Sequence, residues 1–419
     1  MSSSSSLKIE KLIKKGVKIP NPESVEIGDD VDTDRISGNN TVIYSGCKIY
    51  GNSTLILHGA RLGYEGPATV KDCQIGPMVQ LKGGFFNDAV FLSKASAGFG
   101  AHVREGTILE EESSIAHTVG LKQTILFPFV TLGSLINFCD CLMSGGTSRK
   151  NHSEVGSSYI HFNYTPDQDK ATPSLIGDVP NGVMLNQNPI FLGGQGGLVG
   201  PCRLAFGTVI AAGTINRKDE LRPQRLILDK GGKGGNIAFV PGSYKIIKRT
   251  VINNIIYLGN LIALMQWYVH VRKQFVSDDF PEQLFAGLKQ KLNMAIDERI
   301  KRFKELTDKI QHSAVLDKDA NNLQHRELYK MWPSMEESFN KLRSASWDHV
   351  LKDAFIEKVN IAIKKYGRDY IAVIKALESR DLETGTAWLQ GIVNDINRQL
   401  LEIIPSFKEY STYFRLKEH

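Results

Sequence analysis

Between residues 25 and 216 the apolar positions recur about every six residues, and glycine often directly follows an aliphatic or aromatic residue. Examples are Ile27-Gly28, Ile75-Gly76, Phe99-Gly100, Val119-Gly120 and Leu132-Gly133. Such a period points apolar side chains into a three-sided prism, and glycine suits the corners, where the backbone can require a positive φ. The pattern therefore predicts a parallel β-helix over 25–216, with roughly ten coils of three hexapeptides each. A β-sandwich is the alternative, but its strands would be separated by longer polar turns.

The six-residue period ends after residue 216. Residues 217–245 are predicted as a linker, because the glycine-rich stretch 229–236 lacks the spacing of a P-loop. From 246 to 419 apolar residues recur at helical spacing, which predicts an α-helical domain. Residues 1–24 are predicted as a helical or flexible N-terminal segment.

Two stretches of the helical domain invite other interpretations. Residues 251–271 are nearly uncharged, but they contain three asparagines and a glutamine, and amides are costly in lipid. We therefore expect a buried helix there and no membrane span. Residues 297–306 alternate acidic and basic side chains, and we interpret them as a solvated helix face.

Composition narrows the class of protein. The 419 residues include 51 Lys and Arg against 45 Asp and Glu, a net charge of +6 that is too dilute to indicate nucleic-acid binding. The five cysteines are irregularly spaced, which excludes a disulfide-stapled mini-domain and favours a reducing compartment. We interpret the isolated pair Cys139 and Cys141 as small buried side chains, not as metal ligands. The N-terminus has no secretory apolar run, so the expected location is cytoplasmic.

Three segments carry more information than the repeat itself: residues 104–122, residues 155–164, and residues 191–214. Together they resemble the acetyltransferase domain of the bacterial bifunctional N-acetylglucosamine-1-phosphate uridyltransferase/glucosamine-1-phosphate acetyltransferases. The resemblance covers about residues 100–215 and does not extend to the uridyltransferase domain. It implies a left-handed β-helix that assembles as a homotrimer, with acetyl-CoA or another acyl-CoA as co-substrate.

In that family an arginine and a lysine on successive coils hold the phosphate of the amino sugar, and Arg104 and Lys122 match them. Guanidinium and ammonium groups suit this task because both donate charge-assisted hydrogen bonds to phosphate. The two residues are 18 positions apart, which is one coil of three hexapeptides, so the spacing independently predicts that they share a face.

Other positions are assigned by the resemblance alone. It implies that Asn163, Tyr164 and Lys170 contact the sugar phosphate or sugar nucleotide. It likewise implies that Gly194 and Ala212 border the acyl-CoA arm, where small residues leave room. No metal ligand is expected.

This sequence departs from the family pattern at the position of the general base. Ser134 occupies the place of the family's catalytic histidine. A hydroxyl does not hold a proton taken from an amine near neutral pH, whereas imidazole does. Three candidates for the missing base are His152, carried by a six-residue insertion before Asn163, and His117 and Asp140.

Three functions follow as hypotheses. The chain is an acyl-CoA-dependent acyltransferase acting on a sugar phosphate or sugar nucleotide. Alternatively it binds a sugar nucleotide such as UDP-N-acetylglucosamine and has lost acyl transfer. In the third hypothesis the prism is a rigid structural rod and the helices dock it to a partner.

Overall fold

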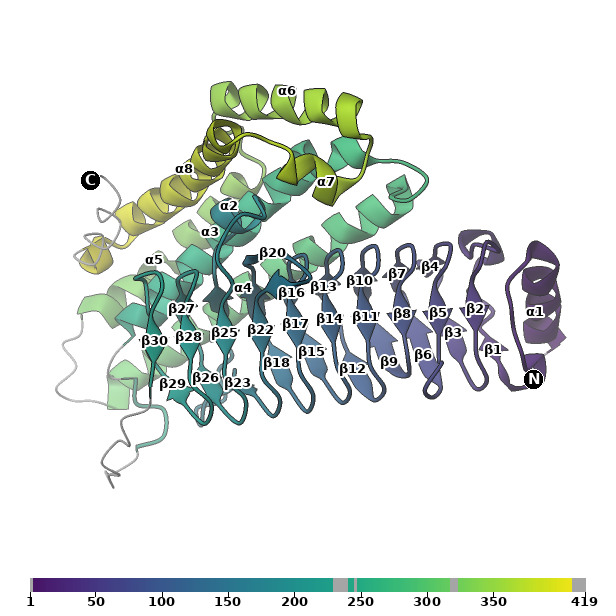
Figure 1. Cartoon of the computed structure of the whole chain (residues 1–419). Helices are drawn as coiled ribbons and strands as arrows, with labels where there is room; N and C mark the ends of the chain where they lie inside the picture. Colours follow the sequence, from purple (N-terminus) through teal and green to yellow (C-terminus); the bar gives the residue numbers. More distant parts are fainter. Residues whose placement is uncertain (1–2, 229–239, 245–246, 317–322, 409–419) are drawn as a thin grey trace.

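The protein is described by a computed structural model that covers residues 3–228, 240–244, 247–316 and 323–408. A parallel β-solenoid of about 11 turns is followed by helices that pack along one side of it (Figure 1). The parallel β-helix followed by a helical region, expected from the sequence, is thereby confirmed. The glycine-rich stretch 229–236, predicted to be part of a linker, lies outside the described residues.

Each coil passes through three parallel sheets in turn. The first sheet contains β2 (Val42–Ile43), β5 (Arg61–Leu62), β8 (Gln80–Leu81), β11 (Ser96–Ala97), β14 (Ser114–Ile115), β17 (Thr131–Leu132), β22 (Glu154–Val155), β25 (Phe191–Leu192), β28 (Val209–Ile210) and β30 (Leu226–Ile227). The second sheet contains β1 (Glu26–Ile27), β3 (Lys48–Tyr50), β6 (Ala68–Lys71), β9 (Gly84–Asn87), β12 (Ala101–Val103), β15 (Gly120–Lys122), β18 (Asn137–Cys139), β23 (Ile160–Phe162), β26 (Gly197–Val199) and β29 (Ile215–Asn216). The third sheet contains β4 (Leu55–Ile56), β7 (Gln74–Ile75), β10 (Ala89–Phe91), β13 (Thr107–Leu109), β16 (Ile125–Leu126), β19 (Cys141–Met143), β24 (Ser174–Ile176) and β27 (Arg203–Leu204).

The core of the solenoid is formed by side chains that stack in register from coil to coil. In the second sheet Val103, Leu121 and Phe138 lie opposite one another and are fully buried. The next residue in this row is His161, whose Nδ1 and Nε2 lie 2.7 Å from the Cys139 carbonyl oxygen and the Ser174 hydroxyl. Burial lowers the pKa of His161 to about 4, so this histidine is a neutral core residue near neutral pH.

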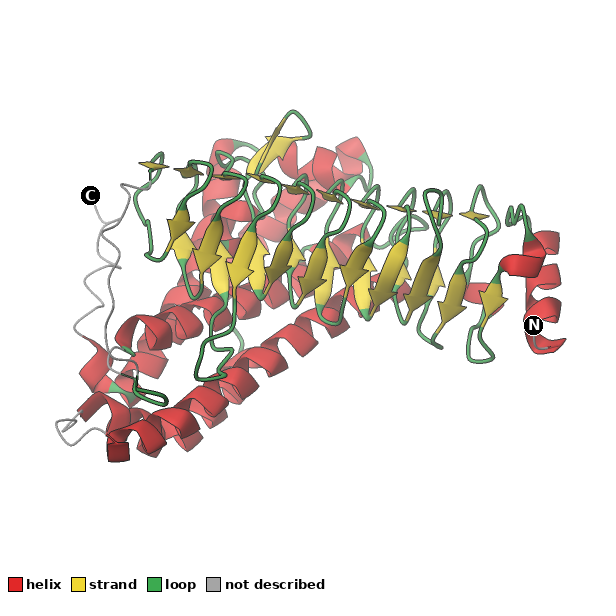
Figure 2. Ribbon diagram, turned by 90° about the horizontal axis from the view of Figure 1, so that it is seen from below, coloured by secondary structure: helices red, strands yellow, loops and turns green. Residues whose placement is uncertain are grey.

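Helices lie at the start of the solenoid, on its side, and in the connections between coils. They are α1 (Ser3–Lys15), η1 (Pro22–Ser24), η2 (Thr33–Arg35), α2 (Val179–Gly182), α3 (Lys248–His270), η3 (Arg272–Phe275), α4 (Glu282–Leu316), α5 (Leu323–Arg343), α6 (His349–Tyr366), α7 (Tyr370–Lys375) and α8 (Ser379–Ile403). Helix α4 crosses β7, β10 and β13, so the helical region covers the third sheet (Figures 1 and 2).

Helix α3 is the stretch predicted as a buried helix, and it is buried along most of its length. Its asparagines are paired inside the protein: Asn254 Nδ2 donates to the Ala171 carbonyl at 3.0 Å, and Asn260 Oδ1 accepts from the Val179 amide at 2.9 Å. Asn260 Nδ2 also donates to the Ile256 carbonyl oxygen, whereas Asn254 Oδ1 is buried without a hydrogen-bond partner. Among the described helices, none combines the length and apolar character that a bilayer span requires.

Two insertions between the third and first sheets lie late in the solenoid. Residues beyond β19 form an antiparallel hairpin, β20 (Gly146–Ser148) and β21 (Asn151–His152), at the edge between the third and first sheets. Helix α2 projects from the same edge one coil later and packs against α3 and α8. These additions therefore enlarge the side of the rod that faces the helical region.

Candidate functional site

A pocket of about 390 Å³ lies where the second sheet ends and turns toward the third, next to helix α4. We call it the cationic pocket, and it is lined by Arg104, Lys122, Asn137, Cys139, Asp140, Asn163, Tyr164, Lys170 and Glu298. Six of these nine residues are those that the sequence singles out as candidate site residues. The fold thus collects in one cavity residues that are spread over 67 positions, from 104 to 170.

Arg104 and Lys122 lie side by side on adjacent coils. Val103 is opposite Leu121 in the ladder between β12 and β15, and the Arg104 amide donates to the Leu121 carbonyl oxygen at 2.9 Å. The next pair along the ladder is therefore Arg104 and Lys122, with both side chains on the outer face. This is the arrangement that an 18-residue coil predicts.

The charges of the pocket are only partly neutralised. Lys122 Nζ lies 2.5 Å from Glu105 Oε1; partial burial opposes charge on Glu105, yet this hydrogen bond lowers its pKa below the usual value. Among the described residues no carboxylate lies within 4.0 Å of the Arg104 guanidinium, whose Nη2 is 3.9 Å from Cys139 Sγ. Arg104 Nε is buried without a hydrogen-bond partner. The pocket therefore offers an unpaired guanidinium, to which an anion can bind.

Asp140 forms part of the wall, and its carboxylate is held by two neighbours. Arg299 Nη2 lies 2.6 Å from Oδ1, and Asn163 Nδ2 donates to Oδ2 at 2.5 Å. Arg299 Nη1 also donates to the Lys170 carbonyl oxygen at 3.2 Å. Such a network orders Asn163 and the loop before Lys170. Asp140 is therefore better placed to position these residues than to accept a proton from a ligand.

His152 is not brought to the cationic pocket. It ends the β20–β21 hairpin at the edge between the third and first sheets, where its Nε2 lies 3.7 Å from Glu154 Oε2. The insertion folds back on itself as a hairpin and adds no strand to the second sheet. The hypothesis that this insertion supplies the missing base therefore has no geometric support.

Ser134, Gly194 and Ala212 lie on a different edge, where the first sheet turns into the second. Successive coils place His117, Ser134, Ser157, Gly194 and Ala212 in one line, which we call the edge row. Ser134 Oγ lies 2.8 Å from His117 Nδ1, and the Ser134 amide donates to Ser157 Oγ at 3.1 Å. The row is polar at His117 and Ser134 and nearly without side chains at its far end.

Sequence reasoning did not find the contribution of helix α4. Glu298 lines the cationic pocket and Arg299 is 2% exposed, whereas the charge pattern of their segment predicts a solvated face. The alternating charges of 297–306 predict a helix, but they do not predict the carboxylate that pairs with Arg299. That carboxylate belongs to Asp140, on a coil 159 residues earlier in the sequence. A buried arginine of this kind leaves no periodic signal in the sequence.

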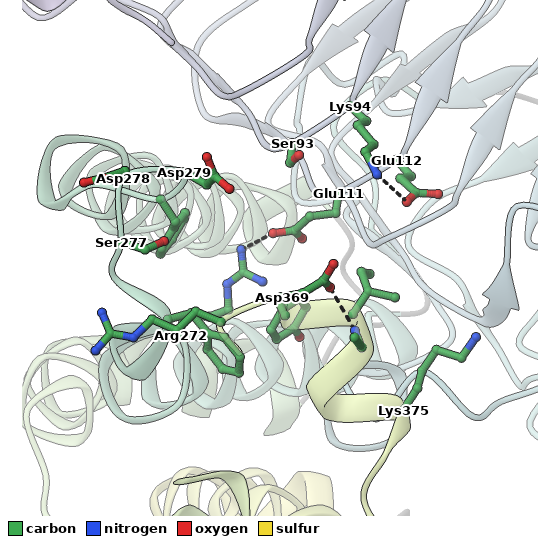
Figure 3. Close-up of a pocket in the computed structure, with 16 residues that line it drawn as sticks. Ser93, Lys94, Glu111, Glu112, Arg272, Ser277, Asp278, Asp279, Asp369 and Lys375 are labelled. Carbon is green, nitrogen blue, oxygen red and sulfur yellow. Dashed lines mark hydrogen bonds and ion pairs between the residues drawn. The ribbon is translucent and has the colours of Figure 1, made fainter. Parts of the chain in front are cut away.

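A larger cavity, of about 710 Å³, lies between the edge of the third and first sheets and the segments around η3 and α7 (Figure 3). Arg272 forms an ion pair with Glu111 there, and its guanidinium carbon lies 3.8 Å from the ring centroid of Tyr370. Lys94 and Glu112 form a second pair at 3.7 Å. The contacts of Arg272 and Tyr370 tie the helices to the solenoid, whereas Lys94 and Glu112 join two neighbouring coils. No candidate site residue from the sequence lines this cavity.

Comparison with known proteins finds similarity over half of the chain. A protein named bifunctional protein GlmU from Thermotoga maritima is 29% identical over 216 residues, which is 51% of this chain and 42% of that protein. The proteins of the same name from Pelobacter propionicus and Carboxydothermus hydrogenoformans are 29% identical over 209 residues and 27% identical over 213 residues. They are covered over 40% and 42% of their length, and this chain covers 50% and 51% of its own.

The chain thus spans about two fifths of the length of the curated relatives that it matches. No family model matches it. The similarity and the parallel solenoid together confirm the resemblance expected from the sequence: the chain resembles hexapeptide-repeat acyltransferases, in particular the GlmU acetyltransferase domain.

Proposed function

We propose that the chain is an acyl-CoA-dependent transferase that binds an amino-sugar phosphate or a UDP-sugar in the cationic pocket. The observation that carries this proposal is the unpaired guanidinium of Arg104 beside Lys122, in a cavity that also presents the amide of Asn163 and the phenol of Tyr164. The cations suit a phosphate, and the amide and phenol suit sugar hydroxyl groups. The resemblance to the GlmU acetyltransferase domain supports the same substrate class.

The edge row is the proposed place for the acyl donor, which we propose is acetyl-CoA or a related acyl-CoA. Because Gly194 has no side chain and Ala212 has only a methyl group, no large side chain projects from this edge on two successive coils. With about 4.8 Å between coils, the row from His117 to Ala212 extends over roughly 19 Å. An extended pantetheine arm suits a long, narrow surface of this kind, with the thioester at the polar end near Ser134.

Binding to the cationic pocket is tested by calorimetry and thermal shift on the full chain, with glucosamine 1-phosphate, UDP-N-acetylglucosamine and acetyl-CoA. Each charge-assisted hydrogen bond contributes about 1.5–3 kcal/mol, so the variant Arg104→Ala/Lys122→Ala should bind the sugar phosphate about 100-fold or more weakly. The matched control is Lys48→Ala/Arg61→Ala, which removes two exposed cations elsewhere on the solenoid. Equal affinity in the two double variants contradicts the proposal.

A second candidate is a sugar-nucleotide-binding protein without acyl transfer. Two observations favour it: Ser134 stands where the family has its catalytic histidine, and Asp140 is held by Arg299 and Asn163. In this case UDP-N-acetylglucosamine raises the melting temperature, while incubation with acetyl-CoA and glucosamine 1-phosphate releases no free thiol. Thiol release above the rate without enzyme excludes it.

We further propose that the chain assembles as a homotrimer. Phe191, Val209 and Leu226 are in register on the outer face of the first sheet and are 40%, 38% and 62% exposed. Aligned apolar side chains at a surface favour burial against another molecule. Light scattering on the purified chain should give three times the monomer mass, and Val209→Lys should lower it; a monomer for both contradicts the assembly.

A cytoplasmic location is also proposed, because all five cysteines are buried free thiols, as suits a reducing compartment. Cell fractionation tests the location.

A further inference from the structure

His117 and Ser134 form a pair on adjacent coils that the family position alone does not reveal. Ser134 Oγ lies 2.8 Å from His117 Nδ1, and His117 is exposed at the edge of the second sheet. Either tautomer of His117 fits this contact, because the serine hydroxyl can accept from Nδ1–H or donate to an unprotonated Nδ1. When Nδ1–H donates to Ser134 Oγ, the lone pair of Nε2 is free. No hydrogen bond from a described residue occupies Nε2.

The surface between this pair and the cationic pocket is open. Gly120 lies between His117 and Lys122, directly opposite Asn137, which lines the pocket. A Cβ built on Gly120 meets only the Ile136 carbonyl oxygen, at 3.9 Å, and its φ is not in the left-handed region. Neither packing nor backbone conformation therefore requires glycine here. What its small size provides is free space on the outer face.

The distances suit a single ligand that reaches across this strip. Ser134 precedes Asn137 by three residues, at most about 10 Å of extended chain. Lys122 and His117 are five residues apart, at most about 16 Å. A sugar phosphate held by its phosphate at Arg104 and Lys122 would lie over Gly120 with its far side toward His117.

We propose that His117 is the proton acceptor for acyl transfer and that Ser134 positions it, with the acceptor amine lying over Gly120. This inference rests on the proposed transferase function. In the step, the acceptor nitrogen forms an amide bond to the acyl carbon, the carbon–sulfur bond of the thioester breaks, and the nitrogen loses a proton to His117 Nε2. The imidazolium then returns this proton to the departing thiolate, so coenzyme A leaves as the thiol.

Two side chains from other coils face or interact with His117. Ser134 faces it from the next coil, and the Glu65 carboxylate, bonded to Lys82 at 2.9 Å, interacts with it electrostatically from the loop after β5.

The test measures thiol release from acetyl-CoA with glucosamine 1-phosphate, together with the thermal shift given by the sugar phosphate alone. His117→Gln should lower kcat by about 10²–10⁴-fold and leave the thermal shift unchanged. Ser134→Ala should lower kcat less, and Ser134→Thr should restore it. In the nitrogen NMR spectrum of the ring, Ser134→Ala should abolish the preference for the Nδ1–H tautomer.

Gly120→Val gives an independent test of the open strip. Valine suits a strand, so the unfolding midpoint should stay equal or rise, while the thermal shift from glucosamine 1-phosphate and the turnover are lost. The matched control is Thr69→Val, three coils away in the same register row of the second sheet.

The outcomes separate the two proposals. Undiminished turnover in His117→Gln, or undiminished ligand response in Gly120→Val, overturns the inference and leaves the transferase function standing. Sugar-phosphate binding without turnover in the unmodified chain also overturns it, and then favours the binding protein. Absence of binding to the unmodified chain overturns the proposed function itself.

Discussion

Arg299 Nη2 lies 2.6 Å from Asp140 Oδ1, and this contact joins helix α4 to the coil that forms one wall of the cationic pocket. Both side chains are almost fully buried, at 3% and 6% exposed. Each charge has lost its hydration, and only the attraction to the other charge compensates for that loss. The pocket and the helical region are therefore coupled through one ion pair.

The first prediction concerns this pair. Arg299→Met leaves the Asp140 carboxylate buried without its counter-charge, which should lower the free energy of unfolding by about 3–5 kcal/mol. The double variant Asp140→Asn/Arg299→Met removes both charges and should recover most of the loss. Urea unfolding of the three proteins gives the comparison. If the single and double variants unfold at the same midpoint, the pair does not couple the two parts.

The second prediction concerns Glu105, which competes with a ligand for Lys122. Glu105→Gln should release the ammonium group and strengthen binding of glucosamine 1-phosphate by about 2- to 5-fold, because partly exposed ion pairs contribute about 0.3–1 kcal/mol. Calorimetry measures the change. As a control, Glu26→Gln removes the comparable carboxylate beside Lys48 at 3.6 Å and should leave the affinity unchanged. Weaker binding in Glu105→Gln would show that the carboxylate contacts the ligand itself.

The third prediction concerns the joint between the helices and the solenoid. Burial raises the pKa of Glu110 to about 7 against the opposing charge of Arg272, and the Tyr268 hydroxyl donates to its Oε1 at 2.5 Å. The folded state therefore holds a proton that the unfolded chain releases near pH 4.5. By linkage, this carboxyl's contribution to stability is present below pH 4.5 and is lost as the pH rises to about 7.

The corresponding experiment compares Glu110→Gln with the unmodified protein by chemical unfolding between pH 4.5 and 7.5. The variant should gain stability relative to the unmodified protein as the pH rises, by roughly 3 kcal/mol at about 1.4 kcal/mol per pKa unit. Glu112→Gln, two residues away at the surface, is the control. A constant difference across this range would mean that Glu110 is charged in the folded protein throughout.

The placement of Arg104 and Lys122 follows from spacing, whereas that of Asn163 does not. The coil from Arg104 to Lys122 has 18 residues, but the ladder then sets Lys122 opposite Cys139, after 17, and Asn137 opposite Ile160, after 23. Counting by hexapeptides fails once a hairpin interrupts the coil. The position of Asn163 was available only through resemblance to known sequences.

The repeat in the sequence determined the parallel solenoid, the inward side chains and the shared face of Arg104 and Lys122, because these depend on a local period that every coil repeats. Only the tertiary structure decided that His117 meets Ser134 and that Arg299 meets Asp140. The first contact depends on the length of one particular coil. The second contact depends on where a helix from the other half of the chain packs against the solenoid. Such packing is determined by the whole solenoid surface, so no period in the sequence predicts it.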